Sequence, residues 1–371
     1  LFCLTMVAAI GAMAQTTFTS GDLSYTVTDD VKHYVSVAKT ESTTGALVIP
    51  SSVTHEDVTY AVTSIAENGF VQAPVTSVTI PSSITSIGSY AFGPYGATST
   101  ITSVVIEDGD TPLAMPNERY TRPFGEISSQ YTLYLGRNLT LDGEVDGPTF
   151  YNVTSVTIGP NVTSINPKLF MYTNLLSSVT IGNAVTTIGD YAFKGVGGDE
   201  SVEEVTITLG NSVTSIGNNA FQDNPKLKSI TLPQSLVSIG NEAFRSDGLT
   251  SISIPASVTT LGYCVFTSNT ITSVTFEDSP NALSMRIDSD WNPFYSLNDT
   301  EHLRRTVYLG RNLTLEGSTD FPVNLLESIT FGPQVTTINE SLFRGFTTLT
   351  SVTMGANITS IETWGQVPVT L

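Results

Sequence analysis

The chain alternates apolar and polar residues in short runs that recur at a nearly constant interval. Residues 76–81, 227–233 and 250–255 each place an apolar side chain at every second position and a proline at the end. Alternation with a period of two is typical of a half-buried β-strand. The side chains that we expect to face inward are Val78 and Ile80, Val156 and Ile158, Val179 and Ile181, Ile230 and Leu232, and Ile252 and Ile254.

A second motif lies between these runs. SIGSYAF at residues 86–92 recurs as SINPKLF from Ser164, TIGDYAF from Thr187, SIGNNAF from Ser215, SIGNEAF from Ser238, TLGYCVF from Thr260 and TINESLF from Thr337. Most leading apolar residues are spaced by 22 or 23 residues, with one step of 28 and two of 78 and 77. A period of this length predicts a repeat solenoid, in which each turn stacks on its neighbours.

Each motif carries a phenylalanine five residues after its leading apolar residue. These positions are Phe70, Phe92, Phe170, Phe193, Phe221, Phe244, Phe266 and Phe343. We expect the rings to form a ladder through the core, with burial of each contributing roughly 1.5 to 3 kcal/mol. The preceding Gly-Asn, Gly-Asp or Gly-Ser favours a short helical or 3-10 turn. Each coil should therefore run strand, loop, short helical turn, loop, with the strands in one parallel β-sheet stack.

The two long steps contain degenerate turns, at about residues 107–152 and 277–325. Residues 133–135 and 307–309 keep the strand spacing within them, and YLGRNLTL occurs in both, at residues 134–141 and 308–315. The chain thus carries a repeat of about 170 residues over the short one. Counting strand positions predicts about 13 coils, and a stack near 60 Å long at about 4.8 Å per coil.

The two ends differ from the repeat. Residues 1–14 are apolar and close in Ala12-Met13-Ala14, which predicts a truncated export signal peptide cleaved after Ala14. Residues 15–45 alternate in two runs and predict an N-terminal β-hairpin cap, and residues 46–371 form the solenoid. The chain stops at Leu371 inside a turn, so we expect a fragment of a longer protein.

The pattern L-x-x-I-x-I-P-x-x-V-x-x-I-G-x-x-A-F, matched by residues 227–244 and 249–266, resembles the BspA-like (Treponema pallidum-type) leucine-rich repeat of Bacteroidetes-like surface proteins. The resemblance covers about residues 47–361. It implies an exported, non-enzymatic protein that adheres to host matrix proteins, to other bacteria or to host receptors. The chain departs from the family in its two long units and in lacking the cysteine that often follows Ala-Phe.

Composition and net charge exclude some classes of binding partner. The net charge is −19 and only 13% of residues are charged, with no basic patch, which argues against nucleic acid or an anionic membrane. After residue 14 no apolar run reaches 18 residues, so we expect no transmembrane span. The mature chain keeps one cysteine, Cys264, which we expect to be a lone buried thiol.

Residues for catalysis are few. His33, His55 and His302 have no Cys or His neighbour at metal-ligand spacing, and no nucleophile elbow or phosphate-binding glycine loop is present. Acidic runs, such as that at residues 199–204, lack the ordered spacing of calcium loops and are interpreted as solvated surface. We therefore predict no enzyme activity, no catalytic residue, no cofactor and no metal site.

The candidate partner-binding residues lie in the two long units. Tyrosine, tryptophan and arginine are the residues that most often anchor interfaces. They are Tyr120, Arg122, Tyr131, Tyr134 and Arg137 in the first unit, and Trp291, Tyr295, Arg304, Arg305, Tyr308 and Arg311 in the second. The alternative is that Tyr134 and Tyr308 merely stand on the outer face of a strand, while Trp291 and Phe294 fill space left by a longer loop.

Three functional hypotheses follow from these observations. The first is a secreted or cell-surface protein that binds a protein or glycoprotein, possibly of the host extracellular matrix. The second is a glycan-binding module in which exposed Tyr and Trp stack on sugar rings. The third is a passive solenoid spacer for a missing C-terminal domain. The ligand, the binding face, the mode of surface attachment and the oligomeric state stay open at this point.

Overall fold

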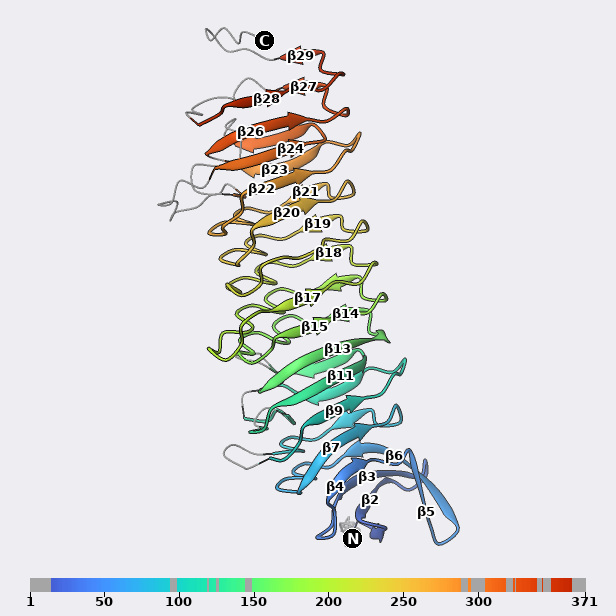
Figure 1. Cartoon of the computed structure of the whole chain (residues 1–371). Coiled ribbons are helices and arrows are strands. Elements are labelled where there is room, and N and C mark those ends of the chain that lie inside the picture. The colour runs from blue at the N-terminus through green and yellow to red at the C-terminus, as the bar shows by residue number, and fades with distance from the viewer. Residues whose placement is uncertain are drawn as a thin grey trace, which may run out of the picture.

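The fold is a β-solenoid, shown as one elongated stack in Figure 1. The computed structural model describes residues 15–93, 99–118, 120–124, 127–143, 149–287, 293–294, 304–317, 323, 325–338, 342 and 348–361. The N-terminal cap lies at one end of the stack and the last described coils at the other (Figure 1). The predicted signal peptide, residues 1–14, lies outside the described residues.

Each regular coil contributes one strand to a front sheet and one to a back sheet. The front strands are β4 (Gly45–Val48), β7 (Val75–Ile80), β9 (Ser103–Ile106), β11 (Tyr131–Arg137), β13 (Val153–Asn161), β15 (Ser178–Thr180), β17 (Thr206–Thr208), β20 (Ser251–Ile254), β22 (Ser273–Phe276), β24 (Arg305–Leu309), β26 (Leu326–Phe331) and β28 (Ser351–Thr353). They pair in parallel in two runs, β4 to β17 and β20 to β28. The predicted strand at residues 227–233 falls between the runs and is not a regular strand.

In the regular coils the back strands are two residues long, because they use only the Ser/Thr-Ile/Leu pair of each motif, whereas β6 and the back strands of the long units have four to eight residues. They are β6 (Val58–Ile65), β8 (Ser86–Ile87), β10 (Leu113–Pro116), β12 (Leu139–Asp142), β14 (Ser164–Ile165), β16 (Thr187–Ile188), β18 (Ser215–Ile216), β19 (Ser238–Ile239), β21 (Thr260–Leu261), β23 (Leu283–Ile287), β25 (Leu313–Gly317), β27 (Thr337–Ile338) and β29 (Ser360–Ile361). Neighbouring back strands that pair do so in parallel. The sequence interpretation had assigned these residues to a loop and so missed the second sheet.

The predicted helical or 3-10 turns are wrong, since the described residues contain no helix. The Ala-Phe segments form hydrogen-bonded turns instead. The residue two positions before each phenylalanine has a positive φ, as at Tyr90 (55°), Tyr191 (59°), Asn219 (55°) and Glu242 (55°). A right-handed helical turn requires negative φ at successive residues, so one left-handed residue in each motif prevents it.

The stack has about 11 turns, slightly fewer than the 13 coils predicted. The prediction counted every front-strand position as one coil. A closed turn runs from one front strand to the next, so the number of turns is smaller than the number of positions. The first interval is also not a simple turn, because β5 (Ser52–His55) folds back on β6 as an antiparallel hairpin. The predicted parallel stack is otherwise confirmed.

The phenylalanine ladder is confirmed and is longer than predicted. Ring centroids of successive members lie 4.9–5.9 Å apart from Phe70 to Phe294. The long units supply Phe124, Phe150 and Phe294, which keep the ladder continuous where the motif degenerates. Phe343 lies outside the described residues. The inward residues of the front strands are buried as predicted, except that Ile230 is half-buried.

The N-terminal cap closes the back sheet only. β2 (Leu23–Asp29) and β3 (Tyr34–Lys39) form the predicted antiparallel hairpin, and β1 (Thr17–Ser20) adds a third strand that was not predicted. β3 then pairs in parallel with β6, which joins the cap to the back sheet. The cap thus pairs the terminal edge that an open back sheet would expose.

Candidate functional site

The outer side of the front sheet carries two columns of side chains that, apart from Val105, all bear a hydroxyl, and we call them the hydroxyl face. The strand register aligns Ser77, Ser103, Thr132, Ser155, Ser178 and Thr206 in one column, and Thr79, Val105, Tyr134, Thr157, Thr180 and Thr208 in the other. The second run of strands aligns Ser251, Ser273, Thr306, Ser328 and Ser351, and Ser253, Thr275, Tyr308, Thr330 and Thr353.

The hydroxyl face follows directly from the period-two alternation, because every residue between two core positions points outward. None of the aligned positions holds a charged residue. Neighbouring residues of one column are about 4.8 Å apart, the spacing of paired strands. The result is a long face, rich in hydrogen-bonding groups, on which Tyr134 and Tyr308 are the only aromatic side chains.

The two tyrosines are held in the same way. The Tyr134 hydroxyl donates to Asp108 Oδ1 at 2.7 Å, and the Tyr308 hydroxyl donates to Asp278 Oδ1 at 2.8 Å. Burial and the bond to Asp108 raise the pKa of Tyr134 above its ordinary value. The bond to Asp278 is the first cause of the raised pKa of Tyr308. Both phenols therefore stay protonated through the physiological range.

A glycine in the following coil makes room for each tyrosine. A Cβ placed on Gly159 would lie 2.7 Å from the Tyr134 hydroxyl, and one on Gly332 would lie 2.5 Å from the Tyr308 hydroxyl. Real Cβ atoms do not approach this closely, so any other residue would displace the phenol. Because the hydroxyl reaches over the glycine of the next strand, the ring runs along the sheet surface instead of standing away from it.

Two of the predicted interface arginines are structural. Arg137 is fully buried, with Nη1 donating to Ser82 O at 2.9 Å and Nη2 to Pro81 O at 2.8 Å. Arg311 is also fully buried and donates to carbonyls that include Val258 O at 2.6 Å and Glu277 O at 3.2 Å. Burial lowers the pKa of both guanidinium groups. Each arginine joins backbone carbonyls of earlier coils through hydrogen bonds. Because the side chain is fully buried, it cannot contact a partner.

Three more candidates are buried as well. Arg122 donates through Nε to Asn117 O at 3.3 Å, and Arg305 through Nε to Ile271 O at 2.9 Å. Tyr131 is fully buried, and burial raises its pKa strongly. The two guanidinium groups thus satisfy backbone carbonyls inside the coil, and the strand register shifts beside Tyr131 and Arg305. Their predicted contact with a partner is therefore corrected to a role in the core.

The other candidates are exposed or lie outside the described residues. Tyr120 is 60% exposed. Arg304 is exposed and pairs with Glu327 at 3.0 Å, a surface ion pair. Trp291 and Tyr295 lie outside the described residues. Of the described candidates, Tyr120, Tyr134, Arg304 and Tyr308 thus remain accessible, and partner binding by them stays a prediction.

The sequence analysis did not assign roles to Asp108, Asp278, Gly159 and Gly332. A signal was present, because Glu-Asp follows the strand in both long units, at residues 107–108 and 277–278. Recognising its meaning requires the coil stacking, which brings each aspartate to a tyrosine 26 or 30 residues away.

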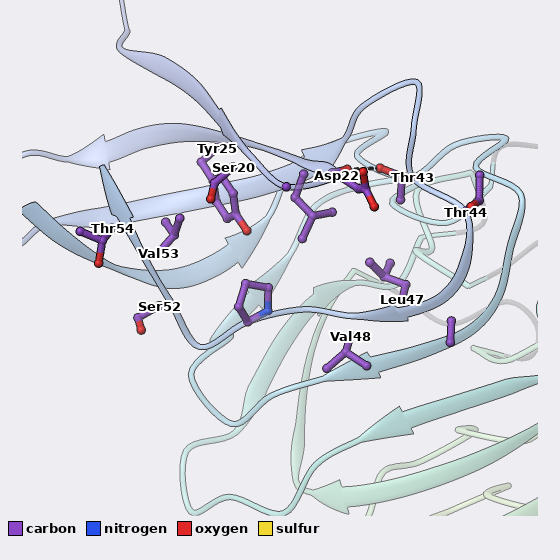
Figure 2. Close-up of a pocket in the computed structure, with 14 residues that line it drawn as sticks. Ser20, Asp22, Tyr25, Thr43, Thr44, Leu47, Val48, Ser52, Val53 and Thr54 are labelled. Carbon is purple, nitrogen blue, oxygen red and sulfur yellow. Dashed lines mark hydrogen bonds between the residues drawn. The ribbon is translucent and has the colours of Figure 1, made fainter. Parts of the chain in front are cut away.

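A shallow cavity lies between the cap and the first front strand (Figure 2). It measures about 500 Å³ and is lined by the β1–β2 turn, by residues 43–48 and by β5. Figure 2 shows Ser20, Asp22, Thr43 and Thr54 among the residues around it. Asp22 is the only charged residue of this lining, so the cavity contains no acid–base pair.

Chemistry beyond binding has little support in the described ranges. Within them, no group of three or more His, Cys, Asp or Glu residues is placed to hold a metal ion. Cys264, the one cysteine in the described ranges, is buried. No helix of sufficient length and apolarity to cross a bilayer occurs in the described part of the chain. The accessible feature with repeated, defined geometry is the hydroxyl face with its two tyrosines.

Comparison with known proteins gives a consistent result. A model of the BspA type leucine rich repeat region matches in six copies, over residues 50–109, 163–287 and 295–365. A leucine-rich repeat protein from Bacteroides ovatus is similar in structure, with 21% identity, a TM-score of 0.50 and coverage of 93% of this chain and 90% of that one. A leucine rich cell surface protein from Faecalibacterium prausnitzii has 21% identity, a TM-score of 0.40 and coverage of 92% and 95%. A search of curated proteins gave no match.

Proposed function

The chain belongs to the BspA type leucine-rich repeat family, and on that premise we propose that it is an exported, non-enzymatic protein that binds a protein or glycoprotein partner at the bacterial surface. The observation that carries the proposal is the hydroxyl face. It runs along both series of paired front strands, presents hydrogen-bonding groups in fixed register within each series, and has no charged residue at the aligned positions.

The physical basis is preorganisation. Each hydroxyl is attached to a strand that pairs with at least one neighbouring strand, so binding a partner orders little additional backbone. The short Ser and Thr side chains lose less rotamer entropy than Lys or Glu would lose at the same positions. A solenoid is suited to this use because its repeats create an extended surface without requiring a concave pocket.

The test is biolayer interferometry of residues 15–371 against fibronectin, fibrinogen, mucin and a polysaccharide panel. A front variant carries Thr180→Lys and Thr208→Lys. A charge-matched back variant carries Thr187→Lys and Thr260→Lys on exposed positions of the other sheet. We expect the front variant to lose binding by at least tenfold and the back variant to retain it.

The opposite result, with binding lost only in the back variant, would show that the hydroxyl face is the wrong surface. Absence of binding by the unaltered protein to every ligand would favour the spacer hypothesis. Export is tested separately by expressing the chain with residues 1–14 preceded by an added Met and a short Lys-rich segment, which complete the signal peptide, in a bacterial host and assaying the extracellular fraction. Retention of the whole product in the cytoplasm would contradict the localisation that we propose.

A further inference from the structure

The two tyrosines of the hydroxyl face are not required by the fold. The equivalent positions in adjacent coils are Val105 and Thr157 beside Tyr134, and Thr275 and Thr330 beside Tyr308. These coils stack with the same register and the same buried strand residues. A larger side chain that the sheet does not need, and that occurs twice with the same partners, indicates a use on the surface.

Each tyrosine side chain is fixed and partly exposed. The hydroxyl is held by Asp108 or Asp278, and the glycine beneath it lets the side chain run along the sheet. Both side chains are half-buried, so part of each ring stays open to solvent. A fixed, partly exposed ring offers its π-system to C–H groups of a ligand without losing rotamer freedom on binding.

The surroundings of the rings are polar. Around Tyr134 the hydroxyl face supplies Thr132, Ser155 and Thr157, with Val105 as the single apolar neighbour in the column, and the carboxylate that holds the ring supplies further acceptor capacity. The second copy has Thr306, Ser328 and Thr330 in the same places. A protein hot spot would need a desolvated apolar pocket around the aromatic residue, and this environment has none.

From this chemistry we propose that the two tyrosines are stacking sites for a neutral glycan. A pyranose ring has an apolar C–H face and a rim of hydroxyl groups, which match a π-face ringed by hydroxyl and carboxylate groups. Carboxylates stand beside both rings and the chain carries a net charge of −19, so a polyanionic glycan is disfavoured. This inference rests on the proposed function, since it names the chemical class that the binding protein recognises.

The spacing of the two sites adds a length requirement. From β11 to β24 the front sheet advances by seven strand positions, namely β13, β15, β17, residues 228–231, β20, β22 and β24. At about 4.8 Å for each position the sites are roughly 34 Å apart. A linear glycan long enough to span them binds bivalently, and linking two weak sites in this way raises affinity by about 10² or more.

The experiment uses three variants of residues 15–371. Tyr134→Thr and Tyr308→Thr each introduce the residue that neighbouring coils already carry, so the sheet is preserved. Tyr172→Thr removes an exposed tyrosine that is not one of the hydroxyl-face positions and serves as the control. The probes are neutral β-glucan, xylan and mannan, each as a long polymer and as a short oligosaccharide, with heparin as the polyanion. Circular dichroism and thermal unfolding check each fold.

The expected result is binding of one neutral polymer with affinity reduced on the order of 100-fold in either single variant. The matching short oligosaccharide should bind the unaltered protein at two equivalents and each single variant at one, by calorimetry. The double variant should not bind, and the control should behave as the unaltered protein. A glycoprotein that carries the same sugar is tested before and after enzymatic deglycosylation. Comparing its affinity with that of the free polymer shows whether free or protein-linked glycan binds more tightly.

The outcomes separate this inference from the proposed function. A double variant that binds glycan as tightly as the unaltered protein overturns the stacking sites. Binding of heparin in preference to neutral polymers overturns the chemical class. If the unaltered protein binds a deglycosylated protein ligand and no glycan, the inference fails and the proposed function stands. If it binds neither glycan nor protein, both fail.

Discussion

Replacing Asp247 with asparagine is expected to stabilise the solenoid. Asp247 is 4% exposed and occupies the place of an asparagine in a ladder with Asn224 and Asn269. In those coils the side-chain amide donates to two phenylalanine carbonyls, Asn269 Nδ2 to Phe244 O at 2.6 Å and to Phe266 O at 2.9 Å. Asp247 Oδ1 accepts from the Asn224 backbone N–H at 2.9 Å, whereas its Oδ2 has no hydrogen-bond partner.

The carboxyl at this position must face carbonyl oxygens where an amide would donate to them. By the repeat, the carbonyls concerned are those of Phe221 and Phe244. Burial is the first cause of a pKa raised well above the ordinary value, so folding favours the protonated acid. Each unit of that shift corresponds to about 1.4 kcal/mol of folding free energy at a pH above both pKa values. The extra donor of asparagine adds about 0.5–1.5 kcal/mol. Together these give an expected gain of about 1–3 kcal/mol at pH 7.

The pH dependence of the free energy of unfolding shows whether protonation of Asp247 causes the difference in stability. The folded state binds more protons than the unfolded state between the ordinary aspartate pKa of 3.8 and the raised folded pKa. In that window the stability of the unaltered protein falls as pH rises. Asp247→Asn removes this dependence, so the advantage of the variant should be smallest near pH 4 and should increase toward pH 8. Guanidinium unfolding at pH 4, 6 and 8, followed by tyrosine and tryptophan fluorescence, measures it.

A matched variant makes the test sharper. Asn269→Asp places a carboxyl in the next coil of the same ladder and should destabilise the protein. Its free energy of unfolding, relative to that of the unaltered protein, should fall as pH rises, whereas that of Asp247→Asn should rise. Lower stability of Asp247→Asn, or a stability difference that does not change with pH, would refute the argument. Either result would mean that the Asp247 carboxylate is ionised in the folded protein and satisfied by groups other than the ladder carbonyls.

Three further predictions test other parts of the structure. Arg311→Met should lower the free energy of unfolding by about 3–5 kcal/mol, because it leaves buried carbonyls unpaired. Arg304→Ala on the surface should lower it by under about 1 kcal/mol. Equal losses in denaturant unfolding would contradict the structural role of Arg311. Phe221→Ala should cost about 3–5 kcal/mol by opening a gap in the ring ladder, and a smaller loss in thermal unfolding would show that neighbouring rings collapse into it. Asp278→Asn should lower the pKa of Tyr308 toward its ordinary value, since the bond to the carboxylate is the first cause of the raise; spectrophotometric titration of the phenol measures it, and an unchanged pKa would locate the cause elsewhere.

The short period was sufficient to predict the stack. Strand alternation and the recurring phenylalanine depend on spacing within one coil, and spacing is visible in the sequence. Val78, Ile80 and Phe92 were assigned to the core for this reason, and all are buried. The second sheet was missed because most back strands are two residues long, as at Ser86–Ile87. A strand of that length has no alternation of its own and forms only when the next coil pairs with it.

The two YLGRNLTL segments show where sequence reasoning ends. Composition identified tyrosine and arginine as interface residues, and both types are the usual anchors. The fold separated them, placing Arg137 under the carbonyls of an earlier coil while Tyr134 stayed on the surface. Which carbonyls need a donor depends on how the longer coil bends, and the partners are 56 residues apart in the chain.

The sequence by itself determined the repeat, the parallel stack and the core ladder, because each is a consequence of periodic side-chain direction along one strand. Only the tertiary structure decided the left-handed residue that replaces the expected helical turn, the burial of the arginines and the Tyr–Asp–Gly arrangement. Those features depend on contacts between coils, where distances of a few ångströms join residues 23 to 57 positions apart. Local periodicity carries no information about such distances.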